Sequence, residues 1–192
     1  QYFDLKNKRA VISGGASGIG SSIVEHLCEQ GVDVYFFDIN KIEAQKTVKR
    51  IKSKNFKIPT FIECDVKNIK KYKSLILNII RRKGPIDILI NNASNDQRHS
   101  LEQITEKYWD ERMTINLKHY LFAIQTVKKS MSKNKGGSII NLSSVSWIRG
   151  AVMFPAYSTA KAAIHGLTRS LARDLGKYNI RINSISPGSV AT

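Results

Sequence analysis

The chain has few of the residues that would assign it to several large classes of protein. Its only two cysteines, Cys28 and Cys64, lie 36 positions apart, which fits neither a disulfide framework nor a zinc site. Its four histidines are dispersed, so no metal site is expected. No apolar run reaches the length of a membrane span, and no signal peptide is visible. These absences favour a cytoplasmic protein that acts without a metal or a membrane.

Acidic residues are scarce, because 15 Asp and Glu stand against 31 Lys and Arg and leave a formal net charge of +16. The excess is concentrated in residues 41–83, which hold 14 Lys and Arg against three Asp and Glu. Nucleic-acid binding could explain such a charge. However, the lysines are interspersed with Ile, Leu and Val along segments of helical periodicity. We therefore expect solvated outer helices and no nucleic-acid partner.

What the sequence does contain is a regular alternation of strand-like and helix-like segments. Apolar runs typical of strands lie at 8–13, 33–38, 59–64, 86–91, 138–143 and 180–186. Segments with helical periodicity lie at 18–30, 41–54, 67–83, 105–132 and 157–176. This order predicts a Rossmann-type, doubly wound parallel sheet with helices on both faces, the α/β class. No linker divides the chain, so we expect one domain over residues 1–192.

A glycine-rich turn stands between the first expected strand and the first expected helix. Its pattern, G-x-x-x-G-x-G, runs over residues 14–20. Glycines allow the backbone to turn tightly and approach a pyrophosphate, and the helix N-terminus offers free N–H groups. The phosphate-binding residues predicted here are Gly14, Ser17, Gly18, Ile19 and Gly20.

The second expected strand ends at Asp38, eighteen residues beyond Gly20. A carboxylate at this position can accept hydrogen bonds from both ribose hydroxyls of adenosine, and it would repel a 2′-phosphate. Ala16 and Ile39 stand at positions where an NADP-binding protein usually carries Arg or Lys. The sequence therefore predicts NAD as the cofactor, with Asp38 and Ile39 beside its adenosine.

A serine, a tyrosine and a lysine near the C-terminal end form the candidate catalytic group. Tyr157 and Lys161 are four residues apart, so they share one face of a helix, and Ser144 precedes Tyr157 by thirteen residues. A tyrosine that works as a base near pH 7 needs its pKa lowered by roughly 3 units. A nearby ammonium group and a positively charged cofactor ring could lower it.

With these motifs in place, the chain resembles the short-chain dehydrogenase/reductase family over essentially all 192 residues. The resemblance implies an adenine contact at Asp65 and Val66, and a cofactor contact at Asn92 and Ala93. It also implies that Asn116 is a fourth catalytic residue and that Tyr157 and Lys161 contact the cofactor. Near the end of the chain, the residues expected to border the nicotinamide are Pro187, Gly188, Val190 and Thr192. Two positions depart from the family pattern, because Ser94 replaces a glycine and Ser13 replaces the commoner threonine.

The resemblance further implies a mechanism and an assembly. Ser144 would orient the substrate hydroxyl, Tyr157 as phenolate would take its proton, and Lys161 would lower the pKa of Tyr157 and bind ribose. Asn116 would hold a water that links Lys161 to solvent. Members of the family form tetramers on the helices near 105–132 and 157–176. They also continue beyond the sixth strand with a substrate lid and a seventh strand, so we expect this chain to be C-terminally truncated.

Residues 95–99 (NDQRH), residues 108–113 (YWDERM) and the pair Ser146 and Trp147 resemble the NAD-dependent aldose 1-dehydrogenases of that family, the xylose and galactose branch. A sugar needs several convergent hydrogen-bonding groups, and an indole offers a flat face to a pyranose ring. The predicted substrate residues are therefore Asn95, Asp96, Arg98, His99, Ser144, Ser146, Trp147 and Tyr157. The alternative is that Asp96, Arg98 and His99 form a polar cluster that pins a loop, with Trp147 as packing.

Three other functions remain open at the level of the sequence. One is a 3-oxoacyl or other ketone reductase, which would normally favour NADPH and therefore conflicts with Asp38. Another is a hydroxysteroid or polyol dehydrogenase. The third is a protein that binds NAD without catalysis, which the intact set of Ser144, Tyr157, Lys161 and Asn116 argues against.

Overall fold

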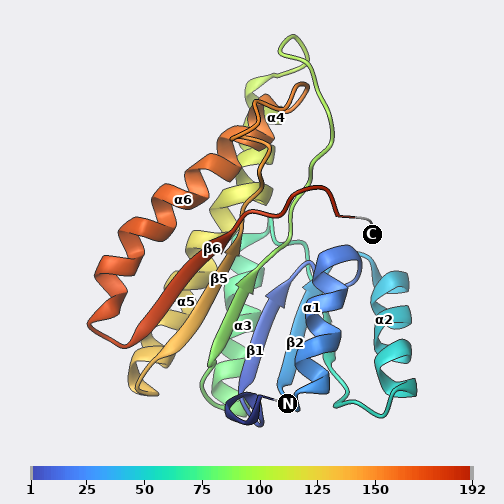
Figure 1. Cartoon of the computed structure of the whole chain (residues 1–192), viewed down its shortest axis with the longest axis vertical. Helices are drawn as coiled ribbons and strands as arrows, with labels where there is room; N and C mark the ends of the chain where they lie inside the picture. Colours follow the sequence, from blue (N-terminus) through green and yellow to red (C-terminus); the bar gives the residue numbers. More distant parts are fainter. Residues whose placement is uncertain (1, 191–192) are drawn as a thin grey trace.

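The structure, a computed structural model, describes residues 2–190. Six strands form one sheet in which every adjacent pair is parallel, in the order β3-β2-β1-β4-β5-β6 (Figure 1). The strands are β1 Arg9–Ser13, β2 Asp33–Asp38, β3 Thr60–Glu63, β4 Ile88–Asn91, β5 Gly137–Leu142 and β6 Ile180–Ile185. The direction of winding reverses between β1 and β4. Ligands of such sheets bind at this switch point, outside the carboxyl ends of the strands.

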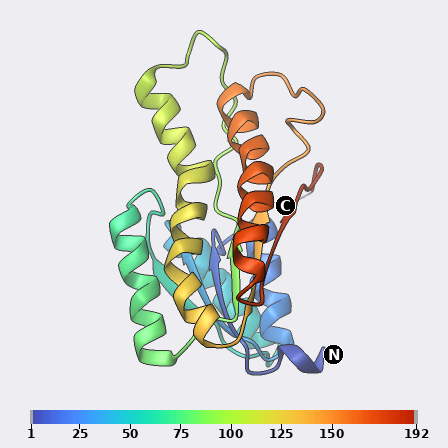
Figure 2. The same cartoon turned by 90° about the vertical axis from the view of Figure 1, so that its left-hand side faces the viewer.

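Helices cover both faces of the sheet, as the alternation of segments predicts. On one face lie α1 Gly18–Glu29 and α2 Lys41–Ser53, beside β1 and β2 (Figure 1). On the other face α3 Ile69–Lys83, α5 His119–Lys133 and α6 Pro155–Gly176 lie side by side as a layer (Figure 2). The doubly wound α/β fold is therefore confirmed. Among residues 2–190, no helix combines the length and apolarity needed to cross a membrane.

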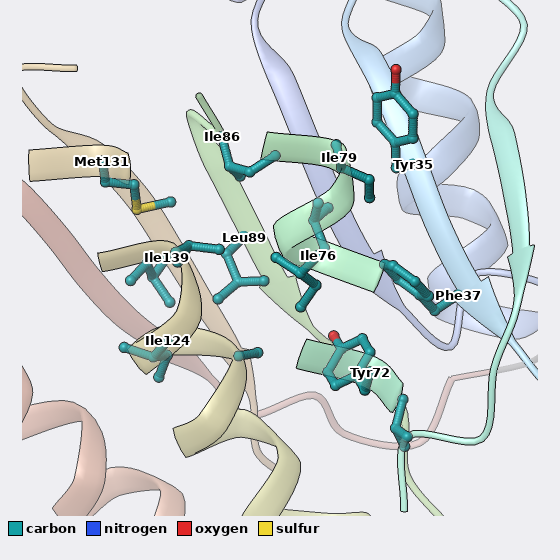
Figure 3. Close-up of a cluster of buried hydrophobic side chains, with 14 of the residues drawn as sticks. Tyr35, Phe37, Tyr72, Ile76, Ile79, Ile86, Leu89, Ile124, Met131 and Ile139 are labelled. Carbon is teal, nitrogen blue, oxygen red and sulfur yellow. The ribbon is translucent and has the colours of Figure 1, made fainter. Parts of the chain in front are cut away.

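Two apolar clusters hold the helices on the sheet, because successive strand residues point to opposite faces. In β1, Val11 belongs to the cluster under α3, α5 and α6, whereas Ala10 and Ile12 belong to the cluster under α1. In the first cluster Tyr72 and Ile76 of α3 meet the strand side chains (Figure 3). Both faces of β1 are thus buried, which explains its uninterrupted apolar run.

The expected elements are confirmed to within a few residues, with one structural difference. The segment 105–132 is not one regular helix but α4 Glu106–Met113, a π-helical turn at Thr114–Lys118, and then α5. The widened turn carries Asn116, whose side chain is fully buried. Turns of this kind are frequent at functional sites, and hydrophobic periodicity does not reveal them.

Candidate functional site

The glycine turn after β1 is as tightly packed as a phosphate-binding loop requires. Gly14 has a φ of 70°, and a Cβ added to it would lie 2.7 Å from the Cα of Ala93. A Cβ added to Gly20 would lie 1.8 Å from the carbonyl oxygen of Gly14. The backbone of the loop therefore packs directly against the residues that follow β4. The N-terminus of α1, at Gly18, lies at the carboxyl edge of the sheet.

The ends of β1 and β4 are tied together by Ser13 and Asn92. The Ser13 hydroxyl accepts hydrogen bonds from the backbone N–H groups of Asn92 and Ala93, at 3.0 and 3.1 Å. In return, the Asn92 amide donates to the carbonyl oxygens of Gly14 and Ser13, at 2.7 and 3.1 Å. A serine hydroxyl thus meets the geometric requirement at a position where threonine is commoner in the family.

Asp38 is held in place by the backbone on both sides of it. Its carboxylate accepts from the N–H of Ala16 at 2.9 Å and from the N–H of Asn40 at 3.0 Å. Ile39, which is 67% exposed, stands beside it, and Asp65 follows β3, the next strand outward. The carboxylate therefore has a fixed orientation before any ligand arrives.

Ser144 and Tyr157 come from two different elements and meet at the end of β5. Ser144 lies two residues beyond this strand, and its hydroxyl accepts from the N–H of Ser146 at 3.1 Å. Tyr157 is the third residue of α6, which begins at Pro155, two residues earlier than expected, because proline is well suited to the first helical position. Lys161 lies one turn further along α6, with Nζ 5.5 Å from the Tyr157 ring centroid.

Burial controls the titration of both Lys161 and Tyr157. Lys161 is 1% exposed, and burial lowers its pKa from 10.5 to about 7. Burial raises the pKa of Tyr157, the hydroxyl of Ser144 acts in the opposite direction, and the charge of Asp96 raises it further. The groups that shift the pKa of Tyr157 in the protein alone are thus burial, Ser144 and Asp96, and the lowering of this pKa by Lys161 stays a prediction.

Asn116 lies in the π-helical turn, which packs against α6, the helix that carries Tyr157 and Lys161. Its side-chain oxygen accepts from the N–H of Asn95 at 2.8 Å, and its NH₂ group donates to the carbonyl oxygen of Asn95 at 3.1 Å. The Asn116 side chain thus fixes the loop after β4. Asn95 makes both of these contacts through its backbone.

An open cleft of about 770 Å³ joins these features along the carboxyl edge of the sheet. It is lined by most of the residues that the sequence singles out, namely Gly14, Ser17, Gly18, Ile19, Gly20, Asp38, Ile39, Asp65, Val66, Asn92, Ala93, Asp96, Arg98, Ser144, Ser146, Tyr157, Lys161, Pro187, Gly188 and Val190. Thr192 lies outside the described residues. A glycine turn, a fixed carboxylate and a tyrosine–lysine pair on one cleft fit an extended dinucleotide cofactor.

Three predicted substrate residues do not line this cleft. His99 is 2% exposed, and its Nε2 accepts from the N–H of Ala156 while its Nδ1–H donates to a loop carbonyl, so it caps the first turn of α6. Trp147 lies against the His165 ring at 5.2 Å between centroids. Asn95 pairs with Asn116, as described above. His99 is thus placed as the structural alternative describes, whereas Trp147 is 39% exposed and its role at the substrate stays a prediction.

The structure also adds residues that the sequence did not point to. Arg149 and Phe154 line the cleft, and the Phe154 ring lies 5.6 Å from the Tyr157 ring between centroids. Arg98 lies over the Phe154 ring, with its guanidinium carbon 4.8 Å from the centroid. Arg149 and Phe154 belong to the loop between β5 and α6, and no sequence spacing links them to Arg98, which was predicted and lies in the loop after β4.

A parallel six-stranded sheet with this cleft defines an α/β protein of the nucleotide-binding type. The family model for short chain dehydrogenases matches residues 8–192. The chain therefore belongs to the short-chain dehydrogenase/reductase family, whose members act on CH–OH groups with nicotinamide cofactors.

Similar proteins include dehydrogenases of sugars. The chain is 39% identical over 192 residues to the probable galactose dehydrogenase GalD of Rhizobium meliloti (strain 1021), covering 100% of this chain and 75% of that protein. It is 41% identical over 191 residues to the D-xylose 1-dehydrogenase of Caulobacter vibrioides (strain NA1000 / CB15N), with the same coverage. A solved short chain dehydrogenase from Mycobacterium smegmatis superimposes with a TM-score of 0.90 at 26% identity, covering 99% of this chain and 80% of that one.

Proposed function

We propose that the protein oxidises the C1 hydroxyl of an aldose to a lactone with NAD. The observation that carries the proposal is a single cleft that holds Asp38 and the glycine turn at one end and Ser144 and Tyr157 at the other. The similarity to proteins named as galactose and D-xylose dehydrogenases supports a sugar substrate. The Ser146 hydroxyl also supports it, because it is buried at the cleft and has no partner among the described residues.

The preference for NAD rests on Asp38. Its carboxylate is fixed by two backbone N–H groups, so it cannot turn away from a 2′-phosphate without losing both hydrogen bonds. Ile39, next to it, supplies no positive charge to offset the repulsion. A free 2′-hydroxyl, in contrast, donates readily to a carboxylate.

In the proposed mechanism the residues of this chain move one proton and orient one oxygen. Bound NAD would supply the hydride acceptor. The Ser144 hydroxyl orients the substrate oxygen, and the Tyr157 phenolate takes its proton. Burial favours the neutral form of Tyr157, so the base depends on a positive charge close to the ring. Lys161 provides that charge when it is protonated, and it can bind ribose hydroxyls of the cofactor.

The test is NADH formation by the protein with NAD. The panel contains pentoses, hexoses, 3-hydroxyacyl thioesters, steroids and sugar acids. Turnover confined to pentoses or hexoses supports the proposal. Turnover on acyl thioesters or steroids alone refutes the sugar assignment and leaves the catalytic group in place. Turnover on none of them, with NAD bound, favours a protein without catalysis.

A sugar acid is the second candidate substrate, because two guanidinium groups line the cleft. Arg98 and Arg149 both line the cleft that Tyr157 lines, and guanidinium groups suit the recognition of a carboxylate. A similar protein, 33% identical over 191 residues, is named 2-dehydro-3-deoxy-D-gluconate 5-dehydrogenase of Dickeya dadantii (strain 3937). Arg149→Gln separates the two candidates, since it should raise KM for a sugar acid at least ten-fold and leave KM for a neutral aldose unchanged.

We also propose that the protein is a cytoplasmic homotetramer with a single domain. Two free, buried cysteines suit a reducing compartment. Leu77 of α3 and Leu121 of α5, on the same helical layer, are 52% and 41% exposed and support contact with a second copy. Light scattering on the protein tests the assembly, and a monomer at micromolar concentration would contradict it.

A further inference from the structure

Lys161 lies between two tyrosines, and only one of them has a part in the proposed reaction. The second is Tyr120, near the start of α5, which is fully buried. Nζ of Lys161 lies 5.5 Å from the ring centroid of Tyr120, the same distance as from that of Tyr157. Tyr120 belongs to no motif that the sequence singled out.

The polar atoms of Lys161, Tyr120 and Leu142 form a closed triangle of hydrogen bonds. Nζ of Lys161 donates to the Tyr120 hydroxyl at 3.2 Å and to the Leu142 carbonyl oxygen at 2.7 Å. The Tyr120 hydroxyl donates its own proton to the same carbonyl oxygen, at 3.0 Å. Because that proton points at Leu142, a lone pair of the hydroxyl is left to face the ammonium group.

The triangle connects the elements that build the candidate catalytic group. Leu142 is the last residue of β5 and lies two residues before Ser144. Tyr120 comes from α5, and Lys161 comes from α6. The Tyr120 hydroxyl thus determines the position of Lys161 Nζ relative to the end of β5. Just beyond that end, Ser144 lines the cleft.

Tyr120 itself cannot replace Tyr157 as a base. Burial raises the pKa of Tyr120 well above its ordinary value, and a negative charge on Tyr157 raises it further. Tyr120 therefore keeps its proton over the working range of pH. It presents a fixed, neutral acceptor to the ammonium group while Tyr157 is free to ionise.

We propose that Tyr120 is a positioning residue, whose hydroxyl, anchored on Leu142, holds the ammonium group of Lys161 beside Tyr157. The inference rests on the proposed function, because it assigns Tyr120 a part in activating the same Tyr157. It adds a residue that touches neither the substrate nor the reacting atoms. Its effect reaches the reaction through the charge and place of Lys161.

The charge of Lys161 should change when the Tyr120 hydroxyl, which accepts a hydrogen bond from Nζ, is removed. The titratable groups that face it are Tyr157 on α6, Tyr120 and His119 on α5, and Asp96 in the loop after β4. His119 is neutral at working pH because burial lowers its pKa to about 3. Burial lowers the pKa of Lys161 to about 7, against a smaller opposite effect of Asp96. A hydroxyl that accepts from the ammonium group favours its charged form.

The experiment removes this hydroxyl in Tyr120→Phe and follows Lys161 directly. Lysine labelled with carbon-13 at Cε is titrated by NMR in the cofactor-free protein, and the Lys161 signal is identified by its loss in Lys161→Met. We expect the pKa of Lys161 to fall by about one unit, the size expected when a charge-assisted hydrogen bond is lost. In the complete enzyme, the acid limb of the kcat/KM profile for alcohol oxidation should move to higher pH, because a less charged Lys161 stabilises the Tyr157 phenolate less.

Tyr72→Phe is the matched control. Tyr72 is also fully buried, lies on α3 and packs against His119, and no hydrogen bond joins it to Lys161 in the described part of the chain. This variant should leave the pKa of Lys161 unchanged. If Tyr120→Phe also leaves it unchanged, the hydroxyl has only a structural role and the proposal is wrong.

A second variant and the choice of readout make the test independent of two other failures, namely misfolding of Tyr120→Phe and an error in the proposed sugar specificity. Tyr120→Met also lacks the hydroxyl, and its flexible side chain can adapt to the core if Tyr120→Phe does not fold. It should lower the pKa of Lys161 in the same way, and an unchanged value would refute the proposal. The NMR titration needs no substrate, so an error in the proposed sugar specificity would leave its result intact.

Discussion

The burial of Lys161 predicts a loss of stability that depends on pH. Folding lowers the pKa of this side chain from 10.5 to about 7, chiefly through burial. Between these two values the unfolded chain holds a proton that folded Lys161 has released. Raising the pH over this interval therefore favours the folded state, and below pH 7 the whole cost of burying the charge is present.

The size of the effect follows from the same two values. A difference of about 3.5 units, from 10.5 to about 7, corresponds to roughly 5 kcal/mol at 1.36 kcal/mol per unit. Lys161→Met keeps most of the side-chain volume and removes the charge. We expect this variant to exceed the wild type in free energy of unfolding by several kcal/mol at pH 6. The excess should fall by about 1.4 kcal/mol for each pH unit above 7.

Urea unfolding followed by tryptophan fluorescence measures this difference at pH 6, 7, 8 and 9. The cofactor is left out, because a ligand that binds only the folded state adds its own stabilisation. Lys49→Met, at an exposed site on α2, is the control and should differ from the wild type by the same amount at every pH. A difference between Lys161→Met and the wild type that does not change with pH would refute the reasoning.

Three further substitutions test the cofactor site and the base. Gly20→Ala places a Cβ 1.8 Å from the carbonyl oxygen of Gly14, so calorimetry should show a loss of NAD affinity of at least ten-fold, whereas Gly166→Ala, at an open helical site, should keep it. Asp38→Asn removes the charge that repels a 2′-phosphate, and the ratio of kcat/KM for NAD over NADP should fall at least ten-fold; an unchanged ratio would be evidence against the role of the carboxylate. Tyr157→Phe should lower kcat by roughly 10²–10⁴-fold with little change in NAD affinity, and near-wild-type turnover would disprove its role as the base.

Much of the fold could be predicted because its signals are local. The strand that ends at Asp38 and the helix that follows the glycine turn are each visible as apolar periodicity over a few residues. The pair Tyr157 and Lys161 is visible because four residues make about one helical turn. The π-helical turn at Thr114–Lys118 escaped prediction, because the apolar spacing on either side of it is still helical.

The substrate end of the cleft is less predictable, since a motif names residues but not the direction of their side chains. His99 and Arg98 are neighbours in the sequence, yet His99 caps α6 from within the core and Arg98 lines the cleft. Which of the two faces the cleft depends on the path of the loop after β4. That path is held by the two hydrogen bonds between Asn116 and the backbone of Asn95.

The sequence by itself determined the parallel sheet, the phosphate-binding turn and the tyrosine–lysine pair, because periodicity, glycine content and spacing along the chain act over short distances. Only the tertiary structure decided the contacts of Lys161 with Tyr120 and Leu142, which lie 41 and 19 residues away along the chain. Only packing brings these three elements together, and packing excludes the water that would otherwise keep the lysine charged. The charge of Lys161 near neutral pH is therefore a property of the folded chain.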